Sequence, residues 1–161
     1  MNPLCHIFAL VVAVLLLGCQ TMRSQEVAKS EIAAATQAWI NGMSRHDIEG
    51  VLGLYDSEAV LWGTRFRTLR DNPTAVCEYF NILRTVPPSY KAVLGEQRIR
   101  IYDDIAINTG TYTFSEVRDG GEIIRRARVS FVYRKRDGRW LMVDHHSSAV
   151  PVAAKPWEGQ A

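Results

Sequence analysis

The chain has 161 residues, of which 47% are hydrophobic, 22% charged and 9% aromatic, with 11 glycines and 6 prolines. This composition is typical of a folded globular protein and excludes a disordered, low-complexity or collagen-like chain. The 19 basic and 17 acidic side chains give a net charge of +2, which is not a nucleic-acid-binding signature. From this charge we expect no nucleic-acid partner. The length suits one domain, and we therefore expect no kinase-sized catalytic unit.

The N-terminal segment has the pattern of an export signal. Residues 7–17 are apolar without a break, which suits a secretory signal and is shorter than the roughly 18 residues of a membrane span. Residues 16–19, Leu-Leu-Gly-Cys, resemble a bacterial lipobox. We therefore expect residues 1–18 to be a signal peptide, Cys19 to be lipidated, and the protein to be exported, as an outer-membrane lipoprotein or a periplasmic protein. Because residues 1–6 carry no Lys or Arg, an ordinary export signal or a misplaced start codon before a cytosolic protein stays open.

The first helix of the folded part is predicted to begin at Ser30. Residues 19–29 are expected to form a tether, and Ser30 suits the N-cap position. From there, mostly apolar residues recur at spacings of three and four, the period of an amphipathic helix. The repeating positions are Ile32, Thr36, Trp39, Ile40 and Met43. One face of this helix is therefore expected to be buried.

Two shorter helices and one strand are expected next. Asp47 is predicted to begin a short helix, and residues 59–62, Ala-Val-Leu-Trp, have a strand-like pattern. Asn72 followed by Pro73 predicts the start of a third helix. Asn can cap the helix, while proline lacks an N–H that would have stayed unpaired there. The two prolines at 87–88 are expected to end it.

From Tyr90 onward the period changes from helical to alternating, which predicts four β-strands. They are residues 91–102, 105–117, 122–136 and 139–148, separated by Asp-Asp, Asp-Gly-Gly and Asp-Gly turns. Helices followed by an antiparallel meander predict an α+β domain in which a curved sheet covers the helices. Because the strands are apolar on both faces in places, we expect the sheets of two subunits to pair and so cover the second apolar face.

Several motifs in the domain occur together with this order of elements. They are Leu-Trp-Gly-Thr at 61–64, Thr-Gly-Thr-Tyr-Thr-Phe at 109–114, Ala-Arg-Val-Ser-Phe-Val-Tyr at 127–133, and, most specifically, Asp-His-His-Ser-Ser at 144–148. With them the chain resembles the nuclear transport factor two-like superfamily. Within it, the chain is most similar to bacterial SnoaL-like proteins of the SgcJ/EcaC type that match the association domain of calcium/calmodulin-dependent protein kinase II.

The resemblance covers residues 30–151 and leaves 152–161 as a C-terminal tail. It implies a cone-shaped barrel, in which a curved, mostly antiparallel sheet wraps the N-terminal helices around a deep pocket. It also implies assembly into a dimer or a larger ring, and no cofactor. It does not imply kinase activity, because the chain has neither a Gly-rich phosphate loop nor a His-Arg-Asp catalytic loop.

In the relatives, basic side chains reach into the pocket, and the matching positions here are Arg70 and Arg128. Guanidinium groups in a low-dielectric cavity need a counter-anion, and their planar fork suits a carboxylate. The resemblance therefore implies a small carboxylate-bearing ligand. Alternatively, both arginines pair with acidic side chains or point into water. Tyr112 and Tyr79 are open between core packing and hydroxyl donation into the pocket.

Two adjacent histidines near the C-terminus raise the question of a metal site. Successive side chains on a strand leave opposite faces, so His145 and His146 cannot hold one ion together, and we expect no metal. His146 shares a face with Asp144 and Ser148, and either face can be the inner one. The family pattern favours His146 as the pocket residue, hydrogen-bonding a ligand or carrying a proton. The alternative is a buried histidine satisfied by backbone or tyrosine partners.

Two functions stay open at this point. The first is an exported, lipid-anchored, self-associating domain whose pocket binds a small organic anion. The second is a SnoaL-like isomerase, cyclase or lyase that uses Asp144 or His146 for proton transfer on a polyketide- or steroid-like substrate. The chain has no recognisable nucleophile motif, and Asp144 is the only carboxylate in an apolar strand segment.

Overall fold

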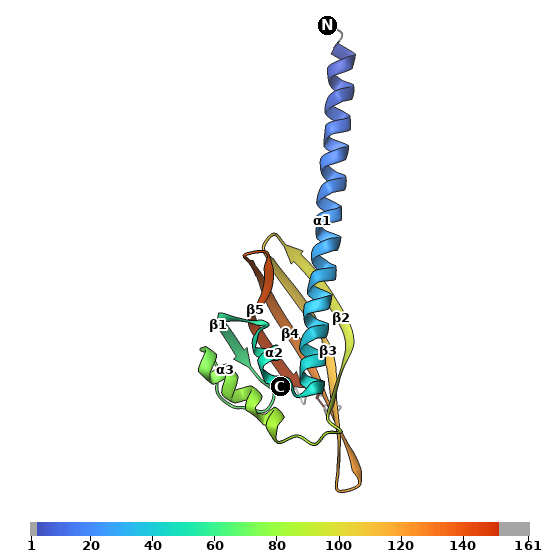
Figure 1. The fold of residues 1–161 in the computed structure, drawn as a ribbon. Helices are drawn as coiled ribbons and strands as arrows, with labels where there is room; N and C mark the ends of the chain where they lie inside the picture. The colour runs from blue at the N-terminus through green and yellow to red at the C-terminus, as the bar shows by residue number, and fades with distance from the viewer. Residues whose placement is uncertain (1–2, 152–161) are drawn as a thin grey trace, which may run out of the picture.

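The computed structural model describes residues 3–151, with side chains from Met22 onward. Figure 1 shows a long N-terminal helix, short helices and a curved sheet. The elements are α1 (Pro3–Arg45), α2 (Ile48–Leu52), β1 (Tyr55–Trp62), α3 (Pro73–Phe80), a 3-10 turn (Asn81–Arg84), β2 (Lys91–Tyr102), β3 (Ile105–Arg118), β4 (Gly121–Arg136) and β5 (Arg139–Ala149). The predicted α+β class with a curved, mostly antiparallel sheet is confirmed.

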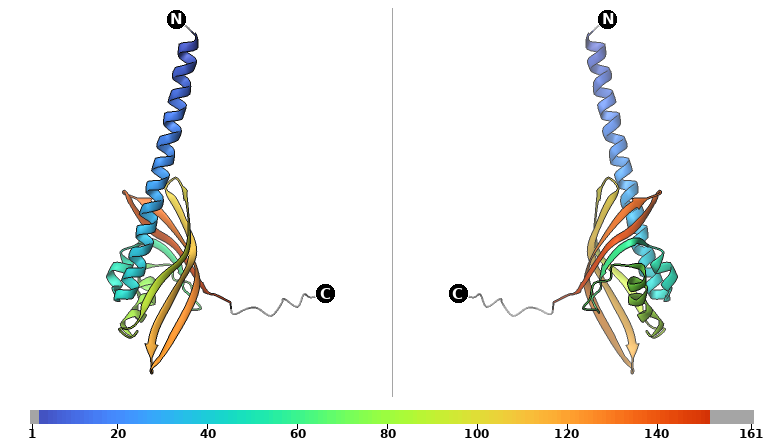
Figure 2. Two further views of the ribbon diagram at one scale, coloured as in Figure 1. Left: turned by 90° about the vertical axis from the view of Figure 1, so that its right-hand side faces the viewer. Right: turned by 90° about the vertical axis from the view of Figure 1, so that its left-hand side faces the viewer.

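The five strands form one open sheet in the order β1-β5-β4-β3-β2. β1 runs parallel to β5, and the other neighbours are antiparallel. β1 and β2 are the two edges and do not pair with each other, so the sheet does not close. Figure 2 shows α1, α2 and α3 on one side of the sheet, which we call the inner face. No described helix covers the opposite side, which we call the outer face.

The four long strands agree closely with the prediction. β2 has the predicted bounds, and β3, β4 and β5 each differ by one residue at one end. At the last hairpin, Asp137 and Gly138 have φ angles of 52° and 76°. This left-handed backbone is favourable for glycine and tolerated by aspartate, which is why an Asp-Gly pair predicts a tight hairpin.

The predicted start of the first helix at Ser30 is wrong. α1 is continuous from Pro3 to Arg45, and residues 19–29 continue it. This segment contains no glycine or proline and is rich in good helix formers, so nothing in it ends a helix. Lys29 and Glu26 add an ion pair at 2.7 Å within the segment. The predicted buried stripe from Ile32 to Met43 is confirmed.

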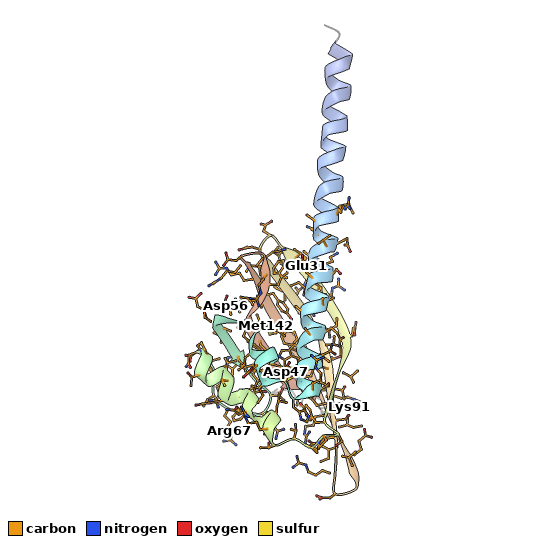
Figure 3. All side chains as sticks on the ribbon, viewed as in Figure 1. Glu31, Asp47, Asp56, Arg67, Lys91 and Met142 are labelled. Atoms are coloured by element: carbon orange, nitrogen blue, oxygen red, sulfur yellow. The ribbon has the colours of Figure 1, made fainter. Side chains whose placement is uncertain are left out.

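α1 is fixed across the sheet at two places. Where α1 first passes over the sheet, at Glu31 (labelled in Figure 3), the carboxylate accepts hydrogen bonds from Lys135 Nζ at 2.8 Å and Trp140 Nε1 at 2.7 Å. At its C-terminal end, Ser44 Oγ donates to the Ala92 carbonyl at 3.2 Å and accepts from the Ala92 N–H at 2.9 Å. The second contact satisfies backbone groups on edge strand β2 that would otherwise be unpaired.

The short helices begin where the sequence predicts. Asp47, between α1 and α2 in Figure 3, accepts a hydrogen bond from the Gly50 N–H at 2.8 Å. Asn72 accepts one from the Ala75 N–H at 3.0 Å and caps α3. The loop between β1 and α3 is closed at its base, because Leu61 and Arg70 exchange two backbone hydrogen bonds.

Trp39 on α1 lies at the centre of the core and is 1% exposed. Its ring contacts Phe80, Tyr112, Phe131 and His145, with centroid distances of 6.3, 5.5, 5.4 and 5.4 Å. One side chain of α1 therefore touches α3, β3, β4 and β5. The inner face of the sheet and the helices share a single core around it.

Candidate functional site

A cavity of about 280 Å³ lies between the inner face and the helices. This volume is close to the lower end of the usual range for ligand pockets. Its apolar wall comes mainly from α1, the 3-10 turn and β3. Its polar and charged members are Thr64, Arg65, Tyr79, Tyr90, Tyr112, Arg125, Arg126 and His145. In the described part of the chain no Asp or Glu lines the cavity, so its charged groups are all cationic.

His145 is the most deeply buried polar group of the cavity, at 1% exposure. Trp39 Nε1 donates to the Tyr55 hydroxyl at 3.1 Å, and that hydroxyl lies 2.7 Å from His145 Nδ1. Trp can only donate, and the Tyr55 hydroxyl has no other acceptor among the described residues. Tyr55 therefore donates a hydrogen bond to Nδ1, and the ring proton of His145 lies on Nε2.

The Nε2 atom of His145 is buried and has no hydrogen-bond partner among the described residues. Burial lowers the pKa of His145 to about 3, with a smaller contribution from His146, so the ring is neutral at physiological pH. Burial also raises the pKa of Tyr55 well above its usual value, so this hydroxyl keeps its proton. His145 is thus a fixed, neutral N–H donor at the cavity wall.

Arg125 on β4 brings a second unused donor to the cavity. Its Nη2 donates to Glu116 Oε1 at 2.6 Å, while its Nη1 is buried without a partner. The Glu116 side chain is 2% exposed and also lies 3.5 Å from Arg118 Nη2. The hydrogen bond from Arg125 holds the pKa of Glu116 below its usual value. Arg125 is therefore oriented by a buried carboxylate, and its Nη1 remains free to donate to a ligand.

Hydroxyl groups complete the polar part of the wall. Thr64 Oγ1 lies 2.8 Å from Ser147 Oγ, which also accepts from the Thr64 N–H at 3.1 Å. Burial raises the pKa of Tyr112, and hydrogen bonds with Ser147 and Thr64 oppose that rise. Burial raises the pKa of Tyr79 to about 12. Both tyrosines therefore carry neutral hydroxyls, which can donate to or accept from a ligand.

The prediction that Arg128 lines the inner pocket is wrong. On β4 the buried side chains are Ala127, Val129, Phe131 and Tyr133, and strand side chains alternate between faces. Arg128 therefore lies on the outer face, exposed, where its Nη2 donates to Ser148 Oγ at 3.3 Å.

The prediction that His146 faces the pocket is also wrong, because of a β-bulge in β5. Tyr133 pairs with Met142 and Val132 pairs with Asp144, which leaves Val143 as an extra residue. Before the bulge the even-numbered positions face inward, and after it the odd-numbered ones do. His145 consequently faces the cavity, while His146 and Asp144 lie on the outer face.

Arg70 follows the alternative that we weighed for it. Its Nη1 lies 3.4 Å from Glu78 Oε2, and its guanidinium lies over the Phe66 ring at 5.0 Å from the centroid. It belongs to the loop after β1 and does not line the cavity. Of the four predicted ligand-binding residues, Tyr112 alone lines the cavity.

His145 and Arg125 were not among the predicted site residues. Arg125 could have been found, since it continues the odd-numbered positions of Val129, Phe131 and Tyr133 that face the core. His145 could not, because no sequence signal marks the bulge at Val143. In the described part of the chain, no three His, Cys, Asp or Glu side chains form a group that could hold a metal ion.

Cys19, the predicted lipidation site, lies in α1, but its side chain is outside the described part, and so is the predicted tail at 152–161. No helix within the described residues is long and apolar enough to span a membrane.

The curved sheet, the helices on one face and the cavity between them form a fold of the kind that nuclear transport factor two-like proteins have. The sequence profile of the calcium/calmodulin dependent protein kinase II association domain family matches residues 28–151. The chain therefore belongs to this family, and the predicted resemblance is confirmed. No curated protein sequence matches the chain at a significant level.

Solved structures agree with this assignment. A candidate association domain of the same family from Xanthomonas campestris is 34% identical, with a TM-score of 0.68 over 75% of this chain and 86% of that one. The association domain of the C. elegans kinase is 21% identical, with a TM-score of 0.66 over 78% and 98%. A candidate dehydratase of the NTF2-like family from Streptomyces avermitilis is 14% identical, with a TM-score of 0.70 over 80% and 99%. The last two show a shared fold only.

The buried neutral ring of His145 predicts a loss of stability in acid. Its pKa is about 3 in the folded chain and near 6.5 when unfolded, so the unfolded chain binds the proton between these values. Stability should therefore fall as pH drops below 6.5, with His145 contributing about 1.4 kcal/mol per pH unit. Urea unfolding at a series of pH values should show a flatter dependence in His145→Gln than in the wild type.

Nitrogen NMR of the imidazole rings gives an independent check on the same residue. We expect the His145 ring to keep its proton on Nε2 and to show no titration between pH 5 and 8. His146→Gln identifies the signals of the neighbouring ring. A His145 ring that titrates near pH 6.5, or that carries its proton on Nδ1, would contradict the hydrogen-bond assignment.

Proposed function

We propose that the protein is an exported, lipid-anchored, self-associating domain whose inner cavity binds a small organic anion. The observation that carries the anion part is the pair of buried, unpartnered donors at one cavity, His145 Nε2 and Arg125 Nη1. A buried donor without a partner costs about 1–3 kcal/mol. A ligand that supplies oxygen acceptors at both places removes that cost.

The two donors lie at different ends of the cavity. His145 pairs with Phe131, and Arg125 comes six residues before Phe131 on β4. Their Cα atoms are therefore about 20 Å apart along the strand, so one carboxylate cannot meet both side chains. Arg65 and Arg126 are exposed beside the Arg125 end. The ligand we propose carries its carboxylate at this cationic end and an uncharged oxygen acceptor toward His145.

Exposed apolar side chains on the outer face support self-association. Large apolar side chains of the strands that are more than a third exposed are Trp62, Val93, Tyr102, Val117 and Ile124. All five occupy outward positions in the strand registers. Large apolar side chains left exposed on one face of a sheet favour burial against a partner. The family is named for an association domain, and we propose a second copy of this chain as the partner.

The anchoring part of the proposal is supported by the sequence and by the length of α1. If cleavage occurs before Cys19, the mature chain begins with a helical segment that runs to the core residue Ile32. Thirteen helical residues span about 20 Å, so this segment would hold the domain clear of the lipid headgroups. The export step and the lipid anchor both depend on the motif at residues 16–19.

No specific observation favours the alternative of a SnoaL-like isomerase, cyclase or lyase. Asp144 and His146, the residues that it requires in the pocket, lie on the outer face. His145 is neutral, and its Nδ1 already accepts a hydrogen bond from Tyr55. We therefore propose the ligand-binding function and not the enzymatic one.

Carboxylate binding should depend on Arg125. Isothermal titration with levulinate, a keto acid, and valerate, which lacks the carbonyl, should show that both bind and that levulinate binds more tightly. Arg125→Lys keeps the charge but loses the fork, and should weaken both by about tenfold. His145→Phe should remove the preference for levulinate. Arg134→Ala, an exposed outward arginine of the same strand, is the matched control. Binding that is lost in Arg128→Ala but unchanged in Arg125→Lys would contradict the inner site.

Self-association should depend on the centre of the outer face. Val132 is half-buried there, and a further positive charge at this position would face outward arginines such as Arg128 and Arg134 of the second copy in a face-to-face dimer. Val132→Arg should therefore shift the full chain toward monomer in analytical ultracentrifugation. Val27→Arg, on the exposed side of α1, is the matched control and should keep the wild-type mass. A monomeric wild type, or an assembled Val132→Arg variant, would refute the proposed face.

Lipidation should be visible by mass spectrometry of protein extracted from membranes. We expect a mature N-terminus at Cys19 that carries a diacylglyceryl group. Cys19→Ala should leave the membrane fraction, whereas Cys77→Ala, which changes the free cysteine of the folded domain, should stay in it. An intact Met1, or cleavage at another position, would rule the anchor out.

A further inference from the structure

A second depression, of about 420 Å³, lies on the outer face and shares no lining residue with the inner cavity. It is formed by strands β2 to β5 alone. The sheet separates it from the inner cavity, so the two hollows lie back to back. Its charged and ionisable members are Glu96, Arg98, Arg128 and His146. The rest of its polar lining consists of the hydroxyls Thr109, Thr111, Ser130 and Ser148.

The two arginines of this depression have little to bind within their own chain. Arg98 makes no hydrogen bond or ion pair with any described residue, and Arg128 makes one long hydrogen bond to Ser148 at 3.3 Å. Glu96 is the single carboxylate of the lining. Two guanidinium groups against one carboxylate leave the depression with a net positive charge at neutral pH.

The strand registers bring these groups toward one point. Arg98 pairs with Thr109, Thr109 pairs with Ser130, and Ser130 pairs with His146, which forms a row across four strands. Arg128 lies two residues from Ser130 on the same outer face. The Cα atoms of Arg98 and Arg128 are then roughly 12 Å apart, from two strand spacings and two residues. Two arginine side chains reaching inward from opposite sides can contact one anion between them.

Hydroxyls line the floor between the two arginines. Thr109 Oγ1 already accepts a hydrogen bond from Arg100 Nη2 at 3.0 Å, so its own proton is free to donate to a ligand. Ser130 lies beside it on β4 and has no side-chain partner among the described residues. Two separate guanidinium groups above a floor of hydroxyl donors suit a tetrahedral anion with several oxygens better than a planar carboxylate.

We propose that Arg98 and Arg128, with the hydroxyls of Thr109 and Ser130, form a site for inorganic phosphate or a small phosphomonoester on the outer face.

This site also affects the pairing of two copies, an inference that rests on the proposed self-association. The central outer face carries Arg98, Arg100, Arg128 and Arg134 against Glu96 and Asp144, so two copies brought face to face repel each other. A bound dianion lowers this repulsion, and phosphate should therefore strengthen pairing of the two copies.

Isothermal titration of the full chain with inorganic phosphate, at ionic strength held constant with sodium chloride, tests the site. We expect saturable binding that Arg98→Ala and Arg128→Ala each weaken about tenfold or more. Arg134→Ala removes an outward arginine of the same strand away from the depression, and should change the affinity by less than about twofold. No saturable binding by the wild type, or an equal loss in Arg134→Ala, would overturn the site.

Sedimentation of the same samples tests the coupling to assembly. Phosphate should raise the mean mass of the wild type and leave that of Arg128→Ala unchanged, while chloride at equal ionic strength should do neither. A wild type that assembles equally without phosphate would refute the coupling and leave self-association standing. A wild type that stays monomeric with and without phosphate would refute self-association, while the titration still decides the phosphate site.

Discussion

The structure depends on a buried hydrogen-bonded chain that runs from Trp39 through Tyr55 to His145. These three residues come from α1, β1 and β5, so their hydrogen bonds join the long helix to the two parallel strands at one side of the sheet. Each buried polar group in it has a partner except His145 Nε2. Because an unmade hydrogen bond in the core is costly, the arrangement has one favourable tautomer and one open donor. This open donor is one of the two unpartnered polar groups at the cavity, the other being Arg125 Nη1.

Most of the fold could be predicted from local patterns, for physical reasons that particular residues illustrate. Asn72 before Pro73 caps α3 through one side-chain hydrogen bond, and Asp137-Gly138 adopts the left-handed backbone that a tight hairpin needs. Such features depend on a few neighbouring residues. The start of α1 depends on more, because Ser30 caps a helix only if the preceding residues leave the helical conformation. Residues 19–29 have no reason to leave it, and the cap is not used.

The site was harder to predict because it depends on which face of the sheet is buried. Strand β4 alternates regularly, so the positions of Val129 and Phe131 predict an inward Arg125 and an outward Arg128. The family pattern favoured Arg128 over this physical argument, and the alternation was the better guide. On β5 the extra residue at Val143 reverses the alternation midway along the strand. A bulge inserts one residue without a compositional signal, and therefore His145 could not be distinguished from His146.

The same alternation explains how one thin sheet can carry two chemically different hollows. Between positions 125 and 128, β4 sends one arginine inward, against Glu116 and the cavity, and another outward, onto the open face. The inner arginine is held by a buried carboxylate and lies beside aromatic side chains of the cavity. The outer one stands among hydroxyls with no acidic partner within hydrogen-bond distance. A shift of β5 by one residue against β4 would exchange the faces of His145 and His146, because each side chain of β5 would move to the opposite face. The bulge at Val143 fixes that register on β5, and so it determines which histidine belongs to the cavity and which to the outer face.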